Sequence, residues 1–539
     1  MRKNWKQGFL ACLTVGLTLA APLFTWAADK EIVILHTNDM HCGINDNLGL
    51  ATVAQMKKDA LQETPYVALV DAGDAVQGAP IGKLSRGEAV VRMMNAAGYD
   101  FAIPGNHEFD YGMERFWQLD KQLKNGYYCA NFTDLRTKKL ALPAYKIMQF
   151  GDTKVAFVGA TTPGTLISST PSFFQDGKGN YLYGFNEDET GHKLYKALQK
   201  SINAARENGA DYVFIVGHLG INGSIEYWNS ENVAANTRGV DAIIDGHSHE
   251  RIQDKHVKNY VGKDVIIAQT GTKLKTVGQI VIGTDGKITS TLIKADGGDN
   301  AKVQKVISRE ITKYEPLLQQ PVGEALVQLR GNDPQTGERL VRNSECSLAD
   351  FVTDAYKAVL GCDVVLVNGG SIRNEIKQGV ITYNNLLEAF PFGNMCAVIE
   401  ASGQQILDAL EFGASRYPEE FGGFFQVAGM EYTVNSKIPS TVQLDEKGNF
   451  YRIGSIYRVS DVRIGGKPLD INKTYTVGGT TYVLKDGGDG NTMFKGCRIL
   501  KDGEISDVDA IIEYMQKHLN GKIGAEYANP YGKGRITIK

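Results

Sequence analysis

The chain has 539 residues, a formal net charge of -3, and 42% hydrophobic and 22% charged residues. This length predicts several domains, and the balanced composition is typical of globular proteins and excludes an intrinsically disordered chain. A mildly acidic protein lacks the excess of cations that non-specific binding to a nucleic-acid polymer requires, so no nucleic-acid partner is expected.

The first 28 residues have the layout of a secretory signal peptide. Three cations precede an uncharged apolar run over residues 8–24, and small residues follow at Ala27 and Ala28. We expect cleavage there, which changes the net charge from -3 to -6 because the segment holds three cations and no acid. A retained anchor is the alternative, which the short run disfavours. No later apolar stretch reaches spanning length, so the expected product is periplasmic or secreted, without a stable membrane anchor.

Six cysteines remain after the predicted signal peptide. An even number in an oxidising compartment allows disulfides, but their pairing cannot be read from sequence. None of the six has CxxC spacing, which disfavours a thiolate metal site. They are Cys42, Cys129, Cys346, Cys362, Cys396 and Cys497.

Five short apolar runs between residues 30 and 295 predict buried strands. Each run ends in polar or glycine-rich residues, a pattern typical of layered α/β folds that carry functional groups at the carboxyl ends of their strands. The runs are EIVILHTND (31–39), YVALVDAGD (66–74), KVAFVGATT (154–162), DYVFIVGHLG (211–220) and VDAIIDGHSHE (240–250).

Apolar residues at helical spacing follow a glycine-rich and acid-rich breaker near residue 297, which predicts one linker helix. Strand and helix signals then resume in a second compact domain. We therefore divide the chain into a signal peptide (1–28), a first domain (29–298), a linker helix (299–320) and a C-terminal domain (321–539).

Polar side chains gather at the ends of the predicted strands. Two pairs lie two residues apart, so both members of a pair would point the same way from an extended backbone. Carboxylates, imidazoles and an amide oxygen suit a hard-to-borderline divalent ion, and a bridging carboxylate can hold two ions. A lone histidine at a strand end is more often structural. Here the candidate ligands are Asp39, His41, Asp74, Asn106, His218, His247 and His249. Together with the neighbouring His107 they include five of the nine histidines of the chain.

The stretch GNHEFDYG (105–112) concentrates ionisable groups between glycines. A plain turn is the simple alternative, because Asn, Gly and Asp all favour turns. His107 precedes Asp110 by three residues, close enough in a helical turn for the carboxylate to orient and charge the imidazole. We expect Glu108 to stabilise a helix N-terminus and to take no part in chemistry.

The motifs D-x-H, G-D-x-x, G-N-H-[ED], G-H and G-H-x-H occur here in this order and resemble those of the calcineurin-like metallophosphoesterases. HTNDMHCG and GNHEFDYG are similar to the 5'-nucleotidase family, which includes bacterial UDP-sugar hydrolases. The resemblance covers nearly the whole mature chain. It implies a four-layer αββα metallophosphoesterase domain and a mixed α/β C-terminal 5'-nucleotidase domain, joined by the linker helix.

The resemblance also implies two divalent metal ions, such as Zn, Mn or Co. One ion would be held by Asp39, His41 and His249, the other by Asn106, His218 and His247, with Asp74 bridging both. Activated water would then attack phosphorus while the protein positions the substrate and stabilises charge. The catalytic pair His107 and Asp110 would stabilise the phosphoryl oxygens or protonate the leaving group.

One residue beside the ligands departs from the family pattern. Cys42 stands next to His41, where a small residue is usual. Its thiol either packs or makes the site sensitive to oxidation.

The second domain carries the expected nucleotide contacts. VVLVNGGSIRNEI (364–376) is a strand that runs into glycines and then an arginine, an arrangement suited to phosphate. EAFPFGN and TTYVLKDGGDGN add aromatic residues and an acid, although Phe390 is expected in the core. The resemblance implies substrate contacts at Arg342, Asn368, Arg373, Phe392 and Asp489, with Tyr482 as a second aromatic contact. Tyr482 stands one residue from the aligned position, which Val483 occupies.

These features indicate an exported hydrolase that acts in nucleotide catabolism. It would release phosphate from nucleoside 5'-monophosphates, with UDP-sugars or other nucleotide pyrophosphates as further substrates that the family allows. A 2',3'-cyclic-nucleotide phosphodiesterase with 3'-nucleotidase activity is an alternative in the same fold. An alternative of another class is a non-catalytic nucleotide-binding surface protein, which the full set of ligands disfavours.

Overall fold

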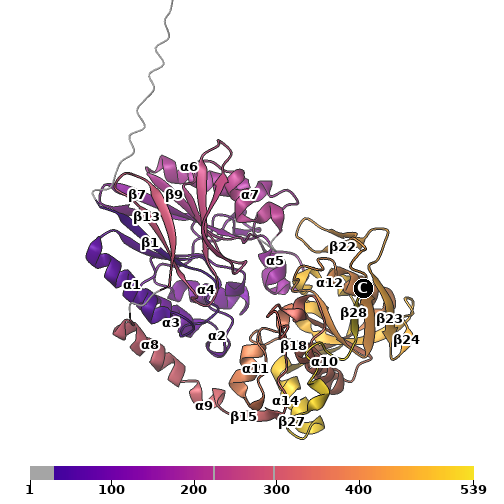
Figure 1. Cartoon of the computed structure of the whole chain (residues 1–539). Coiled ribbons are helices and arrows are strands. Elements are labelled where there is room, and N and C mark those ends of the chain that lie inside the picture. Colours follow the sequence, from indigo (N-terminus) through magenta and orange to yellow (C-terminus); the bar gives the residue numbers. More distant parts are fainter. Residues whose placement is uncertain (1–29, 222–224, 295–297) are drawn as a thin grey trace, which may run out of the picture.

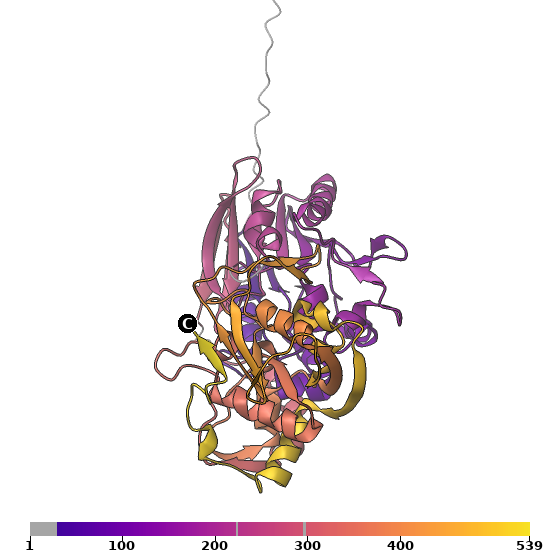
Figure 2. The same cartoon turned by 90° about the vertical axis from the view of Figure 1, so that its right-hand side faces the viewer.

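The computed structural model describes residues 30–221, 225–294 and 298–539, which form two α/β domains side by side (Figure 1). Figure 2 shows the same molecule with the second domain turned toward the viewer. The predicted signal peptide lies outside the described residues. Among those residues no helix is long and apolar enough to cross a membrane. The six cysteines of residues 30–539 are free.

Two sheets form the centre of the first domain. One has the spatial order β14 (Ile288–Ile293), β13 (Val277–Ile282), β1 (Ile32–Thr37), β2 (Val67–Asp71) and β3 (Phe101–Ala102). The other has the order β11 (Arg251–Lys258), β12 (Asp264–Thr270), β10 (Ala242–Ile244), β9 (Tyr212–His218), β7 (Thr153–Thr161) and β6 (Tyr145–Phe150). Strands β1 to β3 are parallel, as are β7, β9, β10 and β12, so the carboxyl ends within each set share one edge.

Side-chain alternation along the strands builds three cores in this domain. In β1, Ile32 and Ile34 lie in the core between the sheets, and Val33 and Leu35 face the helices α1 (Leu50–Glu63) and α3 (Glu88–Ala97). Helices α6 (His192–Glu207) and α7 (Ser230–Ala235) cover the second sheet. Successive residues of a strand point to opposite faces, so each buried strand contributes to two cores. The four-layer αββα order is confirmed.

The segment between the domains holds two helices, α8 (Ala301–Thr312) and α9 (Glu315–Leu318), so the prediction of a single helix over 299–320 is wrong. Pro316 has no N–H with which to continue α8, and it stands in the first turn of α9, where no such bond is needed. Helix α8 packs on α1 and α3, with Val303 and Ile307 in their core. An ion pair of 2.7 Å joins Arg92 Nη2 to Glu310 Oε2.

A five-stranded sheet organises the second domain. Its order is β19 (Phe425–Ala428), β16 (Val364–Asn368), β25 (Thr474–Thr480), β18 (Met395–Ser402) and β26 (Arg498–Ser506). Helices α10 (Ser347–Leu360) and α14 (Asp507–His518) pack on one face, and α12 (Gly403–Gly413) packs on the other. Phe390 is buried with the first group, as expected.

Smaller elements complete the described part of the chain. The second domain has two further sheets and a hairpin. One sheet has the order β17 (Gly379–Thr382), β15 (Pro321–Ala325) and β27 (Lys522–Ile523), and the other has the order β24 (Lys467–Pro468), β23 (Val459–Ile464), β20 (Met430–Val434) and β28 (Ile536–Ile538). The hairpin consists of β21 (Val442–Leu444) and β22 (Phe450–Ile453). The first domain has a small sheet of β5 (Lys139–Leu140), β4 (Thr133–Asp134) and β8 (Tyr183–Gly184). The remaining α-helices are α2 (Pro80–Ser85), α4 (Met113–Gln122), α5 (Thr165–Ser168), α11 (Tyr383–Ala389) and α13 (Thr481–Leu484).

Phe109 anchors the stretch GNHEFDYG by packing in the hydrophobic core that also contains Phe116 and Phe132. Its side chain is fully buried, and its ring centroid lies 4.4 Å from that of Phe116 and 5.4 Å from that of Phe132. We expect Phe109→Ala to lower the free energy of unfolding by about 3–5 kcal/mol, the usual cost of such a cavity. Urea titration measures this change. The control Leu140→Ala removes a side chain that is 44% exposed and should change stability by less than about 0.5 kcal/mol. Equal unfolding midpoints for the two variants would contradict the assignment.

Candidate metal centre and adjoining cavity

The loops that follow β1, β2, β3, β9 and β10 meet at the carboxyl edges of the two sheets. There they bring carboxylates and imidazoles within ligand distance of one another in three overlapping groups. The groups are Asp39, His41 and His249; His41, Asp74 and His107; and Asp39, Asp74 and His218. Asn106 and His247 line the cavity beside them. All seven residues predicted as metal ligands therefore lie at one place.

The backbone at five of these residues has positive φ angles. Asp39, His41 and Asp74 have φ angles of 50°, 45° and 57°, and His247 and His249 have φ angles of 79° and 58°. The expectation that each two-apart pair lies on an extended backbone is therefore wrong. Non-glycine residues seldom adopt positive φ, and such residues cluster at functional sites, where the surrounding structure holds them.

Hydrogen bonds to the backbone fix which ring nitrogen faces the centre. His41 Nδ1 lies 3.0 Å from the carbonyl oxygen of Gln77, and His218 Nδ1 lies 2.8 Å from that of Ala72. A carbonyl can only accept, so each Nδ1–H donates, and in the neutral ring Nε2 is the nitrogen that offers a lone pair. This second contact is how proteins orient imidazoles that bind metals.

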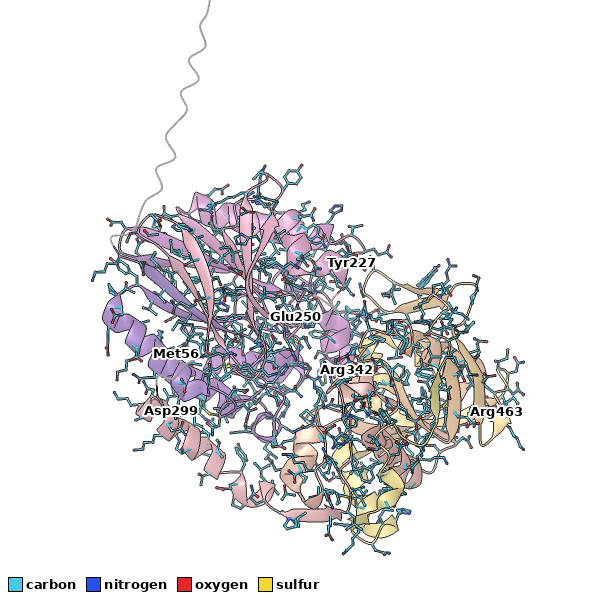
Figure 3. The ribbon with its side chains drawn as sticks, viewed as in Figure 1. Met56, Tyr227, Glu250, Asp299, Arg342 and Arg463 are labelled. Carbon is cyan, nitrogen blue, oxygen red and sulfur yellow. The ribbon has the colours of Figure 1, made fainter. Side chains whose placement is uncertain are left out.

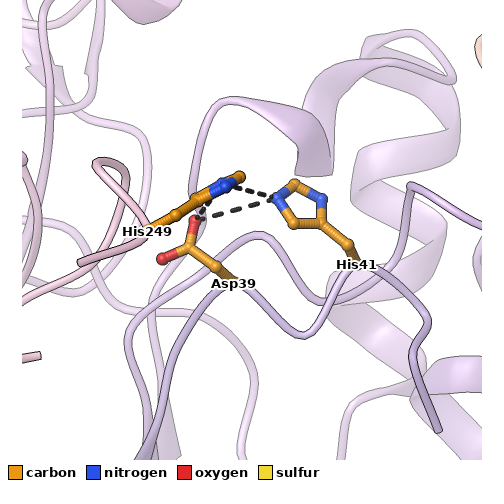
Figure 4. A group of neighbouring side chains, drawn as sticks. All are labelled: Asp39, His41 and His249. Atoms are coloured by element: carbon orange, nitrogen blue, oxygen red, sulfur yellow. Dashed lines mark hydrogen bonds and ion pairs between the residues drawn. The ribbon is translucent and has the colours of Figure 1, made fainter. Parts of the chain in front are cut away.

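The lone pairs then point at other electron-rich atoms. His41 Nε2 lies 3.0 Å from His249 Nε2 and 3.8 Å from Asp39 Oδ1 (Figure 4). His218 Nε2 lies 3.1 Å from Asp74 Oδ2. If the rings are neutral in this tautomer, His41 Nε2 and His218 Nε2 both turn a lone pair toward carboxylate oxygens, and positive charge at this place, from a proton or a metal cation, would satisfy the contacts.

The same atoms lack hydrogen-bond partners. Within the described residues, the buried atoms Asp39 Oδ1, Asn106 Oδ1 and His218 Nε2 have none. Buried polar atoms are nearly always satisfied, so three orphans at one place indicate a missing ligand. Oxygen and imidazole nitrogen donors suit borderline divalent cations, and the residues present therefore fit a metal centre.

The charges of the site lead to the same conclusion. Burial opposes a charge on His218, but Asp74 and Asp39 outweigh it and raise the pKa of the imidazole to about 10. Burial, followed by the charge of His218, lowers the pKa of His247 to about 3. A proton on His218 thus balances the buried carboxylates, and a divalent cation on the same atoms would supply that positive charge instead.

Close backbone contact holds Asp74 in place. The backbone N–H of His107 donates to Asp74 Oδ1 at 2.8 Å. A Cβ atom at residue 105 would stand 2.2 Å from the same oxygen, so only glycine fits there. Gly105, the glycine of the GNH motif, therefore leaves the space that the Asp74 carboxylate occupies.

Glu108 joins the two loops that carry Asp74 and Asn106. Its buried carboxylate accepts hydrogen bonds from the backbone N–H groups of Asp74 at 2.8 Å, Ala75 at 2.7 Å and Gly105 at 2.6 Å. The prediction that it stabilises a helix N-terminus is wrong. Nothing in the sequence marks this role, because the partners are backbone groups that any residue supplies.

The predicted pair of His107 and Asp110 lies beside the metal-ligand candidates, with His107 the first residue of the 3-10 helix η1 (His107–Phe109) and Asp110 the residue that follows it. His107 Nδ1 is 2.5 Å from Asp110 Oδ2, and Ser169 Oγ donates to Asp110 Oδ1 at 2.9 Å. Burial opposes a charge on His107, but Asp110 and Asp74 outweigh it and raise its pKa. This shift favours the protonated ring, which is the form that can donate a proton.

Cys42 is buried at 4% exposure, and burial raises the pKa of its thiol to about 12. A protonated, enclosed thiol has little reactivity. Of the two alternatives for Cys42, packing fits the structure.

A cavity of about 940 Å³ connects the metal centre to the second domain. All six residues predicted to contact substrate line it: Arg342, Asn368, Arg373, Phe392, Tyr482 and Asp489. Figure 3 places Arg342 at the boundary between the domains. His107, Asp110, His247 and His249 line the same cavity from the first domain.

The carboxylate of Asp489 is held between two neighbours. Asn368 Nδ2 donates to Asp489 Oδ2 at 2.6 Å, and Tyr482 Oη lies 3.2 Å from Asp489 Oδ1. Tyr482 Oη also lies 3.1 Å from the carbonyl oxygen of Ile167 in the first domain. Val483, the aligned position, is buried in the core of the second domain.

Sequence reasoning missed many residues of the cavity wall, among them Arg339, Arg416 and Phe421. Arg339 stands three residues before Arg342, a spacing that offered a weak signal. Burial, and then the charges of Arg339 and Arg373, lower the pKa of Arg342 to about 9. An anionic ligand in the cavity would relieve the repulsion between these arginines, so this part of the wall is suited to bind one.

Comparison with known proteins agrees with this geometry. A family profile described as calcineurin-like phosphoesterase matches residues 32–251, and one described as 5'-nucleotidase, C-terminal domain, matches residues 321–496. The metal-ligand candidates fall within the first match, and the predicted substrate contacts fall within the second.

Curated relatives and solved structures match over most of the chain. The 5'-nucleotidase of Rattus norvegicus is 26% identical, over 94% of this chain and 91% of that protein. The trifunctional nucleotide phosphoesterase protein YfkN of Bacillus subtilis is 28% identical, over 94% of this chain and 35% of that protein. The crystal structure of a 5'-nucleotidase precursor from Thermus thermophilus superposes with a TM-score of 0.77 at 26% identity, covering 94% of this chain and 99% of that one.

We expect Glu108→Gln to weaken metal binding. The amide would turn an N–H₂ group toward backbone N–H donors and so loosen the loops that carry Asp74 and Asn106. Partners behind metal ligands typically contribute about 10–100-fold to metal affinity. Equilibrium dialysis against Mn²⁺ measures the loss. The control Glu114→Gln, an exposed acid in the first turn of α4, should bind as the wild type does. Unchanged affinity in Glu108→Gln would contradict the role assigned to this carboxylate.

Proposed function

The chain belongs to the 5'-nucleotidase family of calcineurin-like phosphoesterases and is a hydrolase, and on this premise we propose that it releases phosphate from nucleoside 5'-monophosphates. One observation carries the proposal. A single cavity joins the candidate metal ligands and His107 of the first domain to the arginines and Asp489 of the second. A substrate that reaches both ends needs a phosphate at one end and a polar organic group at the other.

The metal centre in this proposal binds two divalent ions, such as Zn, Mn or Co. Asp39, His41 and His249 would hold one ion and Asn106, His218 and His247 the other, with Asp74 shared. When bound, such ions activate water and neutralise charge on the phosphoryl oxygens. The buried Asp39 Oδ1, Asn106 Oδ1 and His218 Nε2 atoms, which have no hydrogen-bond partner, support this assignment.

His107 and Asp110 would supply the proton chemistry. Asp110 holds the proton on His107 Nδ1, which orients the ring and stabilises its positive charge. The charged ring would then donate from Nε2 to a phosphoryl oxygen, or to the oxygen that leaves with the nucleoside.

The second domain would bind the rest of the nucleotide. Arg342 and Arg373 would neutralise the phosphate, a role suited to guanidinium groups. Asp489, oriented by Asn368, would accept hydrogen bonds from ribose hydroxyls, and Phe392 would contact the nucleoside. Tyr482 would act through its hydroxyl, because that group lies within hydrogen-bond distance of Asp489.

A larger substrate is a second candidate. The cavity volume lies at the upper end of the range for ligand pockets, so UDP-sugars or other nucleotide pyrophosphates fit the same proposal. A 2',3'-cyclic-nucleotide phosphodiesterase with 3'-nucleotidase activity, in the same fold, is the alternative. A non-catalytic nucleotide-binding protein would have no use for a charged His107 beside the metal ligands.

The proposal includes export to the periplasm or the exterior. It rests on the signal-peptide layout of residues 1–28 and on the solved relative described as a precursor. We also retain the division into a catalytic domain at 29–298, a linker at 299–320 and a nucleotide-binding domain at 321–539.

A substrate panel tests the function. We expect phosphate release from adenosine 5'-monophosphate to exceed release from the 3'-monophosphate, and we expect a chelator to abolish both. Excess divalent metal should then restore the activity. Faster release from the 3'-monophosphate would favour the alternative, and full activity in chelator would contradict the metal centre.

We expect His107→Ala to lower kcat by about 10²–10⁴-fold, the usual contribution of a positioned acid. The variant should keep its full content of bound metal, because Asn106 rather than His107 is assigned as the ligand. Assays of turnover, paired with elemental analysis of the dialysed protein, measure both quantities. The exposed His192, replaced by Ala, serves as the control. Loss of an ion in His107→Ala would contradict the division of roles.

A further inference from the structure

The hydroxyl group of Tyr482 has one hydrogen and two acceptors within reach. Its oxygen accepts a hydrogen bond from the backbone N–H of Asp489 at 3.1 Å. Asp489 Oδ1 lies 3.2 Å from the hydroxyl oxygen, and the carbonyl oxygen of Ile167 lies 3.1 Å from it. The two acceptors compete for the single hydrogen. Because Ile167 belongs to the first domain, the outcome decides whether this hydroxyl joins the two domains.

Contact between a ligand and Asp489 would change this competition. Asn368 Nδ2 donates to Asp489 Oδ2 at 2.6 Å, which leaves Oδ1 as the oxygen that faces Tyr482. A charged carboxylate attracts a hydrogen more strongly than a neutral carbonyl does. In the proposed function, ribose hydroxyls donate to Asp489 and offset part of its charge. The hydrogen of Tyr482 then favours the Ile167 carbonyl, so ribose contact in the second domain strengthens a bond to the first.

The carbonyl of Ile167 belongs to a short turn that also reaches the acid pair. In the turn that ends α5, the backbone N–H of Ser169 donates to the carbonyl oxygen of Thr165 at 3.1 Å. Helix α5 packs against the 3-10 helix η6 (Gly488–Gly490), which contains Asp489. A shift of the Ile167 carbonyl therefore moves Ser169, which stands two residues later in the same hydrogen-bonded turn.

Ser169 holds the carboxylate of Asp110. Its side chain is 1% exposed, and its Oγ donates to Asp110 Oδ1 at 2.9 Å. The other carboxylate oxygen, Oδ2, lies 2.5 Å from His107 Nδ1. Contacts at both oxygens fix the plane of the carboxylate and with it the direction of the imidazole ring. Ser169 acts on the acid through Asp110 and is therefore a positioning residue.

We propose that Tyr482 and Ser169 couple ribose contact at Asp489 to the position of Asp110. This inference rests on the proposed function and adds to it a dependence of the acid pair on the ribose hydroxyls. Coupling between two sites is reciprocal, so a substitution at Ser169 that breaks the link must also weaken ribose binding. This reciprocity allows a test that needs no turnover.

Titration calorimetry of the metal-loaded full chain measures binding of adenosine, which has no phosphate to release. The reference ligand is 2',3'-dideoxyadenosine, which lacks both ribose hydroxyls. Without its bond to Asp110, the turn at Ser169 is free to shift away from Tyr482. We expect Ser169→Ala to lower the affinity for adenosine, relative to that for the reference, by about fivefold or more. In a chain that carries Tyr482→Phe, adding Ser169→Ala should lower this ratio no further, because the link is already broken.

Turnover gives a second readout. The ratio of kcat for adenosine 5'-monophosphate over its 2',3'-dideoxy analogue should fall by about tenfold in Tyr482→Phe and in Ser169→Ala, the usual effect of one hydrogen bond to a charged group. Ser455→Ala and Tyr451→Phe remove exposed hydroxyls of the second domain and serve as matched controls. Both controls should keep the wild-type ratios.

Three results of the calorimetry overturn the proposal. An unchanged affinity ratio in Ser169→Ala, including an equal loss for both ligands, would show that Ser169 has no influence on ribose contact. Additive effects of Ser169→Ala and Tyr482→Phe would show that the two residues act separately. A wild type that binds no adenosine would remove the ribose contact itself. Absence of phosphate release while adenosine still binds would contradict only the proposed hydrolysis, and the binding ratios would still decide the coupling.

Discussion

Two buried carboxylates face imidazole nitrogens that have lone pairs to offer. Asp39 and Asp74 lie among His41, His218 and His249, and backbone carbonyls already take the Nδ1 protons of the first two rings. Such a cluster is stable only with positive charge at its centre. The bent backbone at Asp39 and Asp74 and the contacts of Glu108 serve to hold these groups together against their repulsion.

The metal centre alone would not select a nucleotide. The first domain supplies the ligand candidates and His107, while the second supplies arginines and Asp489, and the cavity is complete only where they meet. Tyr482 links the two parts, since its hydroxyl lies near both Asp489 and the backbone of α5. In the proposed function, substrate recognition and hydrolysis are thus divided between two domains, each built around its own sheets.

The strands and the ligand candidates could be predicted from the sequence, because β-branched runs ending in polar residues have a strong local pattern. Three features could not. The positive φ of Asp39 and His41 reflects hydrogen bonds to the loop after β2, which is distant in sequence. Glu108 acts on backbone groups that carry no signature. Phe421 lies in an irregular loop, where only tertiary structure decides which side chain reaches the cavity.

The central claim is that the carboxyl edges of two sheets form one centre for two metal ions around Asp74. Anomalous diffraction from crystals of the protein loaded with Zn²⁺ or Mn²⁺ measures this directly. The account predicts two peaks about 3.5–4 Å apart, with the carboxylate of Asp74 between them. A single peak, or two peaks that share no contact with Asp74, would contradict it.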